Sequence, residues 1–184
     1  MPRSWHPRDI ELLDALDGHE GIQISAPAWR AVRTGRDPLV GHPSRGRWDP
    51  GTFDVIYTSL EREGALAELY FHLSRQPVFP TKTTFSLHQL RVRGENTLRF
   101  LDLRELEPLG VEESQYSSIL YERTRSIGDA AHFLGFDGIV APSARWNCLN
   151  MVLFTDQVNP AVVEVVESSL IDWDDWRRGS NLKS

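Results

Sequence analysis

The sequence contains little cysteine, little lysine and no long apolar run. Its single cysteine, Cys148, excludes an intrachain disulfide and any zinc site built from several cysteines. No stretch approaches the roughly 20 apolar residues of a membrane-spanning helix, and the N-terminal residues lack the apolar segment of a signal peptide. These absences predict a cytoplasmic protein.

The charge balance excludes one class of partner. A net charge of −6 argues against nucleic-acid binding, which requires basic residues to neutralise phosphates. Of the 20 basic residues, 18 are arginines, an excess that codon bias in a GC-rich genome explains. Codon bias does not explain their placement. Five arginines lie within 18 residues that contain one acid, Asp37: Arg30, Arg33, Arg36, Arg45 and Arg47. A basic segment in an acidic protein favours an anionic small-molecule ligand.

Several motifs that commonly bind nucleotides or metals are missing. The chain has neither G-x-G-x-x-G nor G-x-x-x-x-G-K-[ST], so neither a Rossmann nor a P-loop phosphate site is supported. H-E-x-x-H is absent and the six histidines are scattered, so no metal site is predicted. There is no G-x-S-x-G nucleophile elbow.

The length of 184 residues fits one domain, and the hydrophobic pattern predicts an α+β fold with a mixed, mostly antiparallel sheet and flanking helices. Helices are expected over 8–17, 60–74 with Ser59 as N-cap, and 124–134 with Thr124 as N-cap. Strands are expected over 53–57, 85–92, 98–103, 138–141 and 149–154, with a turn over 93–96. Residues 161–166 form either a strand or a short helix. Glycines and prolines make 34–51 a long loop, a length typical of functional segments.

Glu68 is the most informative single residue, because three apolar residues flank it on each side within the helix predicted over 60–74. Leu66, Leu69, Tyr70 and Leu73 form the core-facing stripe of that helix. Glu68 therefore either lies on the solvent side or lines a cleft, where a carboxylate stabilises a cation or acts as a base.

Three further positions each have two interpretations. Tyr57 is either a core tyrosine or a ring that stacks on a flat ligand. Ser143 follows a buried strand and is either a turn residue or a ligand-binding serine, and no neighbouring base would activate it as a nucleophile. Residues 44–51, which include Arg47 and Trp48, form either a surface loop or an anion-binding loop, since a guanidinium group binds two phosphate oxygens at once.

The order of these segments resembles the RES domain family, which is named for its Arg, Glu and Ser. The chain has Trp29-Arg30, then Gly46-Arg47-Trp48-Asp49, Tyr57-Thr58-Ser59, a helix with Glu68, and Gly-Phe-Asp-Gly-Ile leading to Pro142-Ser143, with Asn150 opening the last core strand. The resemblance covers about residues 27–156. The sequence departs from the family pattern at Asp49, where many relatives have asparagine, and in a shorter spacing between Arg30 and Gly46.

The resemblance implies a fold similar to ADP-ribosyltransferase toxins and an enzyme that consumes NAD+ as its substrate without a prosthetic group. NAD+ would be degraded by hydrolysis, or by phosphorolysis with inorganic phosphate as co-substrate. The family implies a toxin of a toxin–antitoxin pair, whose antitoxin has an Xre-like helix-turn-helix domain, covers the active site and forms a hetero-oligomer with it. Direct contact with nucleic acid or membrane is not expected. The matching organisation is an N-terminal helical extension over 1–26, a RES-like catalytic domain over 27–170 and a C-terminal tail over 171–184.

Carried over by position, the resemblance implies Arg30, Tyr57, Glu68 and Ser143 as catalytic residues, with Arg33 close enough that the position of the family arginine stays open. The implied substrate-binding residues are Arg30, Arg33, Arg47, Trp48, Tyr57, Ser143 and Asn150. Cleavage of the nicotinamide–ribose bond passes through an oxocarbenium-like state, which a carboxylate such as Glu68 would stabilise while arginines hold the pyrophosphate.

Three other functions stay open. The same site could transfer ADP-ribose to a protein. A non-enzymatic module would use the cleft only to dock a partner protein. A hydrolase would use Ser143 as its nucleophile. In the C-terminal tail, Trp173 and Trp176 either pack against a partner or cover the protein's own core.

Overall fold

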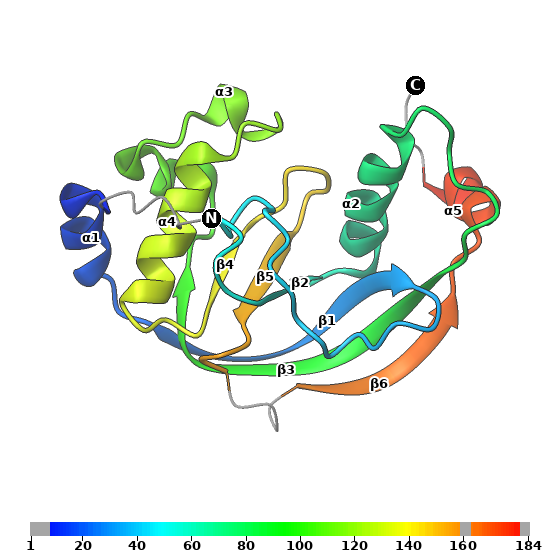
Figure 1. Ribbon diagram of the computed structural model, residues 1–184, viewed down its shortest axis with the longest axis horizontal. Coiled ribbons are helices and arrows are strands. Elements are labelled where there is room, and N and C mark those ends of the chain that lie inside the picture. The colour runs from blue at the N-terminus through cyan, green and yellow to red at the C-terminus, as the bar shows by residue number, and fades with distance from the viewer. Residues whose placement is uncertain (1–7, 159–162, 181–184) are drawn as a thin grey trace, which may run out of the picture.

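The structure is a computed structural model that describes residues 8–158 and 163–180. Helices and strands alternate irregularly along the chain (Figure 1). The order is α1 (Ile10–Asp17), β1 (Ile22–Arg33), β2 (Val55–Ser59), α2 (Arg62–Ser74), β3 (Phe85–Arg99), short 3-10 helices at Leu103–Glu105 and Glu107–Leu109, α3 (Glu113–Tyr116), α4 (Glu122–Phe133), β4 (Gly138–Pro142), β5 (Leu149–Phe154), β6 (Val163–Leu170) and α5 (Trp173–Gly179).

The strands form one mixed sheet in the order β1-β2-β5-β4-β3-β6, and β1 also pairs with β3. The pairings are antiparallel except that between β3 and β4, which is parallel. Because β1 contacts both β2 and β3, the sheet curves back on itself, and the long strands β1 and β3 cross beneath the shorter ones (Figure 1). This confirms the predicted α+β fold with a mostly antiparallel sheet.

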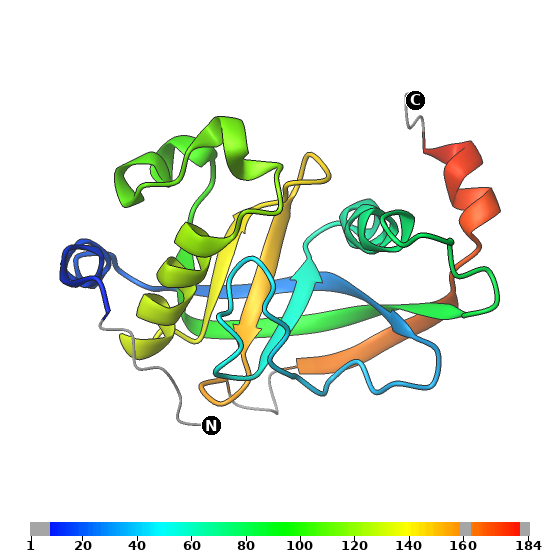
Figure 2. The same ribbon diagram turned by 45° about the horizontal axis from the view of Figure 1, so that its top comes forward.

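Apolar side chains pack in three clusters around this sheet. The first fills the inside of the curved sheet and includes Ala28, Leu90 and Met151. The second lies under α1 and α4, which cover one end of the sheet, and the third lies between the sheet, α2 and α5 at the other end (Figure 2). The two helical groups therefore stand apart, with β2 and β5 between them (Figure 2).

Strand β3 corrects the sequence-based prediction. We expected two strands separated by a turn over 93–96, but β3 runs unbroken from Phe85 to Arg99. The carboxylate of Asp137 accepts hydrogen bonds from the backbone N–H groups of Glu95 and Asn96, at 2.6 and 2.9 Å, and from the hydroxyl of Thr97 at 2.7 Å. These residues favour a turn on their own, and a carboxylate 40 positions away in sequence supplies the partners that keep them extended.

Two predicted helix caps are also wrong. Helix α4 begins at Glu122, so Thr124 lies inside its first turn and donates its hydroxyl to the carbonyl of Tyr121. Helix α2 has Glu61 as its N-cap residue, and Ser59 instead accepts a hydrogen bond from the backbone N–H of Glu61 at 3.3 Å. The observed N-cap lies two residues after the predicted one in α2 and three residues before it in α4.

The two terminal segments pack on the sheet. Leu12 and Leu16 of α1 are buried in the cluster beneath α4, and β1 begins at Ile22, before the predicted border at residue 27. In the predicted C-terminal tail, α5 buries Trp176 against α2, so the tryptophans of this tail cover the protein's own core. Of the predicted segment 161–166, the part from Val163 is strand β6, and 161–162 lie outside the described residues.

The predicted loop over 34–51 is confirmed. Between the end of β1 at Arg33 and the start of β2 at Val55, the chain forms turns and an isolated bridge from His42 to Val55. Strand β2 starts two residues later than predicted, yet Phe53, Val55 and Tyr57 pack into the same cluster, as their alternation requires. No helix within 8–158 or 163–180 combines the length and the apolar character that crossing a membrane requires.

Candidate active site

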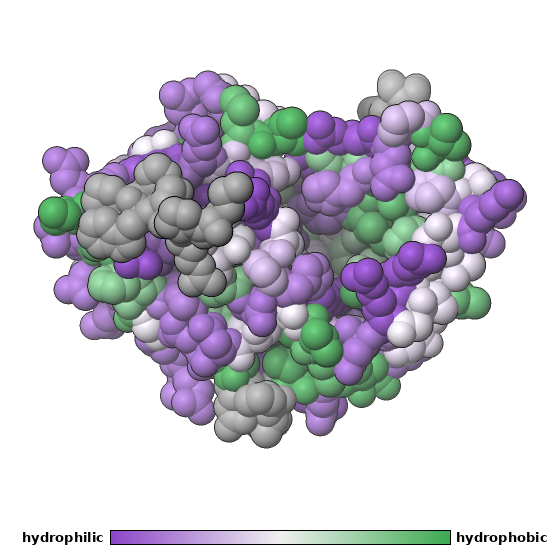
Figure 3. Space-filling model, in the orientation of Figure 1, coloured by the Kyte–Doolittle hydropathy of each residue, from purple (hydrophilic) through white to green (hydrophobic). Residues whose placement is uncertain are grey.

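A cavity of about 820 Å³ opens between α2, the end of β1, strand β2 and the long loop. The space-filling view shows a hollow on this face, with apolar side chains in its depth and polar side chains on its rim (Figure 3). Seven of the eight predicted site residues line it: Arg30, Arg33, Arg47, Trp48, Tyr57, Glu68 and Asn150. A volume of this size is typical of cavities that hold a small-molecule ligand.

Glu68 faces the cavity from the middle of α2, so it does not lie in open solvent. Its Oε1 accepts two hydrogen bonds, from the hydroxyl of Ser143 at 2.8 Å and from Nδ2 of Asn150 at 2.9 Å. Helix α2 buries residues on several sides, including Ala65, Leu66 and Ala67, so the helix is fixed between the sheet and the cavity. Three elements distant in sequence thus orient one carboxylate.

Ser143, the eighth predicted residue, reaches the cavity through Glu68. It follows the last residue of β4, and its hydroxyl oxygen accepts hydrogen bonds from the backbone N–H groups of Arg145 at 3.1 Å and Trp146 at 3.3 Å. Its proton is donated to Glu68. Within residues 8–158 and 163–180, no histidine is bonded to this serine, so the contacts favour an orienting role over that of an activated nucleophile.

Asn150 has a free acceptor beside this carboxylate. It stands in β5 opposite Ser59 of β2, and its Nδ2 is used by Glu68. Its Oδ1 is buried and has no partner among the side chains and backbone that the structure describes. Since buried polar atoms are nearly always paired, this oxygen is suited to accept a hydrogen bond from a bound ligand.

The two candidate family arginines are in different environments. Arg30 is 7% exposed, and its guanidinium donates to the carbonyls of Pro38, at 2.5 Å, and Val40, at 3.2 Å. Burial lowers the pKa of Arg30, although the nearby Asp37 opposes this effect. Arg33 ends β1 and is exposed at the edge of the cavity. Arg30 therefore fixes the long loop, and Arg33 leaves its charge accessible.

Arg47 lines the cavity and contacts α3 and the segment that follows it. Its guanidinium lies 4.4 Å from the ring centre of Tyr116 and 4.6 Å from that of Tyr121, and Nη2 donates to the carbonyl of Ser118 at 3.3 Å. Stacking on two rings holds a guanidinium without neutralising its charge. Tyr121, which also lines the cavity, was not predicted, because residues 104–123 have no clear periodicity.

The loop residue Asp49 was not predicted as a site residue, although it has an organising position. It is 0% exposed and accepts six hydrogen bonds. The donors are the backbone N–H groups of Ser44, Arg45, Gly46 and Gly51 and the hydroxyls of Ser44 and Tyr57. Burial raises the pKa of Asp49, but these hydrogen bonds outweigh it and leave the pKa below its ordinary value.

Tyr57 and Trp48 are joined through the same loop. The hydroxyl of Tyr57 donates to Asp49 at 3.0 Å and accepts from the backbone N–H of Trp48 at 2.8 Å. Burial, followed by the charge of Asp49, raises the pKa of Tyr57 well above its ordinary value. Trp48 is only 2% exposed and packs in the core beneath α4, so its ring has little surface for a ligand. Its role in substrate binding stays a prediction.

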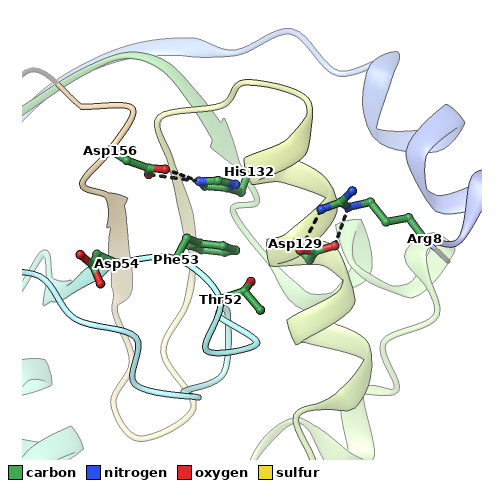
Figure 4. A pocket seen from close by; sticks show the side chains of 7 residues that line it. All are labelled: Arg8, Thr52, Phe53, Asp54, Asp129, His132 and Asp156. Atoms are coloured by element: carbon green, nitrogen blue, oxygen red, sulfur yellow. Dashed lines mark hydrogen bonds and ion pairs between the residues drawn. The ribbon is translucent and has the colours of Figure 1, made fainter. Parts of the chain in front are cut away.

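A second pocket of about 410 Å³ lies away from these residues, between α4, the start of β2 and the end of β5. Figure 4 shows two pairs among its polar side chains, whereas Asp54 has no partner among the residues drawn. Arg8 bonds Asp129 at 2.7 Å, and His132 bonds Asp156 at 2.9 Å while stacking on Phe53. Within the described residues, no group of three or more potential ligands suited to a metal ion occurs here or elsewhere.

The comparisons with known proteins identify the family and the fold of this chain. The chain is 23% identical over 167 residues to proteins named NAD(+) phosphorylase MbcT from Mycobacterium tuberculosis and Mycobacterium bovis, which covers 87% of this chain and 90% of theirs. The fold matches a chain in the crystal structure of the M. tuberculosis MbcT–MbcA toxin–antitoxin complex with a TM-score of 0.82 and 21% identity, over 92% of this chain and 97% of that one. The RES domain family model matches residues 27–177, and the chain therefore belongs to the RES domain family.

Proposed function

We propose that this protein is the toxin of a toxin–antitoxin pair and that it cleaves the bond between nicotinamide and ribose in NAD+. The observation that carries the proposal is the carboxylate of Glu68, held in the cavity by Ser143 and Asn150. The cavity places this carboxylate together with five arginines in one space suited to a dinucleotide. The similarity to NAD(+) phosphorylases supports the same reaction.

The chemistry follows from the charge that develops on the ribose. When the C1′–N bond breaks, nicotinamide leaves with the bonding electron pair and the ribose becomes oxocarbenium-like. Glu68, with Oε1 already bound by two donors, presents a fixed negative charge that stabilises this state. Arg33 and Arg47 would hold the pyrophosphate, while the ring of Tyr57 would stack on the nicotinamide. The free Oδ1 of Asn150 would accept from the carboxamide or a ribose hydroxyl.

We propose inorganic phosphate as the acceptor, and the charge of the cavity lining supports this choice. Five arginines line the cavity with only two carboxylates, Asp37 and Glu68, within a protein whose net charge is −6. NAD+ has a net charge of only about −1, because its nicotinamide is cationic, so the site can accommodate a second anion. A phosphate oxygen would attack the anomeric carbon that nicotinamide leaves, numbered C1″ in the product, which gives ADP-ribose 1″-phosphate and nicotinamide. Hydrolysis or transfer of ADP-ribose to a protein would use the same carboxylate with another acceptor.

The proposed partner is an antitoxin that covers this cavity. The similar fold of a toxin chain solved with its antitoxin supports the pairing, and the family implies an Xre-like helix-turn-helix protein in a hetero-oligomer. Any contact with DNA would come from that partner, because this chain is acidic overall. The substrate is an intracellular dinucleotide, so the toxin would act in the cytoplasm.

Purified protein incubated with NAD+, with and without inorganic phosphate, tests the proposal. We expect release of nicotinamide that depends on phosphate, with ADP-ribose 1″-phosphate as the second product by mass spectrometry. Equal release without phosphate, with free ADP-ribose, would assign hydrolysis. Labelled NAD+ in a lysate that marks a protein band would assign ADP-ribosyl transfer. Protein that binds an antitoxin but never consumes NAD+ would refute the enzymatic proposal and leave a docking module.

A further inference from the structure

The hydroxyl of Tyr57 is bonded to the long loop both as a donor and as an acceptor. Its proton goes to Oδ2 of Asp49 at 3.0 Å, and its oxygen accepts the backbone N–H of Trp48 at 2.8 Å. The ring of Tyr57 nevertheless lines the cavity. Because its hydroxyl already donates and accepts within the protein, Tyr57 contributes to ligand binding through the position of its ring.

Asp49 holds the loop residues on either side of Arg47. Oδ1 accepts from the backbone N–H groups of Ser44, Arg45 and Gly51, and Oδ2 accepts from Gly46 and two hydroxyls. These bonds fix Arg45 at φ 52°, in the left-handed region that a non-glycine residue rarely adopts. A single buried carboxylate therefore closes residues 44–51 into one rigid unit, hereafter the arginine loop.

Helix α4 holds the same arginine loop from outside. Arg125 donates its Nε to the carbonyl of Gly46 at 2.9 Å and a second nitrogen to the carbonyl of Arg45. Gly128 allows the carbonyl of Trp48 to approach the helix so closely that an added Cβ would lie 1.8 Å from that oxygen. Contacts with α4 on one side and with Tyr57 on the other hold the arginine loop in place. In this position the guanidinium of Arg47 reaches the rings of Tyr116 and Tyr121.

We propose that Asp49 is the positioning residue of this site. Its charge fixes the arginine loop so that Arg47 faces the cavity, and it binds the phenolic proton of Tyr57 so that this residue acts on the substrate through its ring alone. The kinetic part of this proposal rests on the proposed function, whereas the structural part does not. Asp49 itself does not line the cavity, so it acts through Arg47 and Tyr57.

Asp49→Asn is the appropriate substitution, because it keeps the shape and removes the charge. In either orientation of the new amide, its NH2 group is a donor placed against other donors. At the position of Oδ2 it faces the N–H of Gly46, and at the position of Oδ1 it faces three backbone N–H groups. Hydrogen exchange measured by NMR should be at least about tenfold faster at Arg45 and Gly46 than in wild type. Asp54→Asn, an exposed carboxylate five residues further on, is the matched control and should leave these rates unchanged.

Steady-state kinetics test the role of Tyr57. We expect Asp49→Asn and Tyr57→Phe each to raise KM for NAD+ about tenfold or more and to lower kcat less than about threefold, because binding groups move while the reacting carboxylate stays. The double variant should be no worse than the more affected single one, since both changes remove the same contact. A loss of about 100-fold in kcat for Tyr57→Phe at unchanged KM would overturn the proposal, because the hydroxyl would then act in the chemistry.

Two safeguards keep these outcomes decisive. If Asp49→Asn does not fold, Ser44→Ala removes the hydroxyl that donates to Asp49 and also accepts the N–H of Gly46, so the effect is measured at Arg45, whose N–H donates to Asp49 and should exchange faster than in Asp54→Asn. If wild-type protein does not consume NAD+, the proposed function fails, but the exchange rates still decide whether Asp49 fixes the arginine loop. Unchanged exchange at Arg45 and Gly46 in folded Asp49→Asn would refute the structural part outright.

Discussion

The charge of Glu68 should dominate the rate, and Glu68→Gln removes that charge with little change in shape. The amide oxygen of glutamine can still accept the hydrogen bonds from Ser143 and Asn150, so the fold and the cavity should persist. What is lost is the attraction between a carboxylate and an oxocarbenium-like ribose. At about 4 Å and an effective dielectric constant of about 20, that attraction is worth about 4 kcal/mol.

A loss of that size corresponds to a fall in kcat of roughly 1,000-fold, with a small effect on KM because the charge develops only in the transition state. The assay is nicotinamide release from NAD+ by chromatography, at saturating phosphate. Glu63→Gln is the matched control on the same helix, since Glu63 accepts a hydrogen bond from the indole of Trp176, on α5. The control should retain kcat within about twofold. If Glu68→Gln keeps more than about a tenth of the wild-type kcat, the electrostatic reasoning is refuted.

Three further outcomes are expected. Ser143→Ala removes one of the two donors that orient Glu68, so kcat should fall about 10- to 100-fold with the melting temperature nearly unchanged; an unchanged kcat would show that the serine is only a turn residue. Gly128→Ala should destabilise the protein by about 2 kcal/mol in urea unfolding, because the new methyl group meets a carbonyl, whereas Gly179→Ala, with nothing within 4 Å, should not. The pKa of Asp49 is lower in the folded state than in the unfolded state. Its carboxylate therefore contributes stability that is fully present above the unfolded pKa of about 3.9 and is lost as the pH falls through the folded pKa. The unfolding free energy of Asp49→Asn should vary less across this acid range than that of wild type.

Much of the fold could be predicted from local sequence. The alternation of Phe53, Val55 and Tyr57 predicted one buried face, and the three share one cluster. The glycines and prolines of 34–51 predicted the loop. The failure at 93–96 has a specific cause, since a turn-forming segment is kept extended by the carboxylate of Asp137, the residue just before the adjacent strand β4. Local propensity has no information about a partner so distant in sequence.

The site residues were found by pattern, but their roles were not. The order of aromatic, arginine, glutamate and serine segments indicated which positions to consider, and seven of the eight line one cavity. The sequence alone did not decide whether Glu68 faces solvent or a cleft. Helical spacing gives the side of α2 on which a residue lies, but it does not show what packs against that side. Asp49 was noted only as a departure from the family pattern, since nothing in a linear sequence shows that six donors converge on one carboxylate.

The sequence by itself determined the class of this protein: a single α+β domain, a RES family pattern and a basic loop in an acidic chain. Composition and periodicity decide the fold class and the basic loop, because each depends on residues close together in the chain, whereas the family pattern is a resemblance in the order of motifs between Trp29 and Asn150. Only the tertiary structure decided that Glu68 is held by Ser143 and Asn150, that Arg30 is committed to the loop backbone, and which groups remain free for a ligand. Hydrogen-bond partners and burial depend on contacts between distant segments, and these exist only once the sheet has closed and the loop has packed against α4.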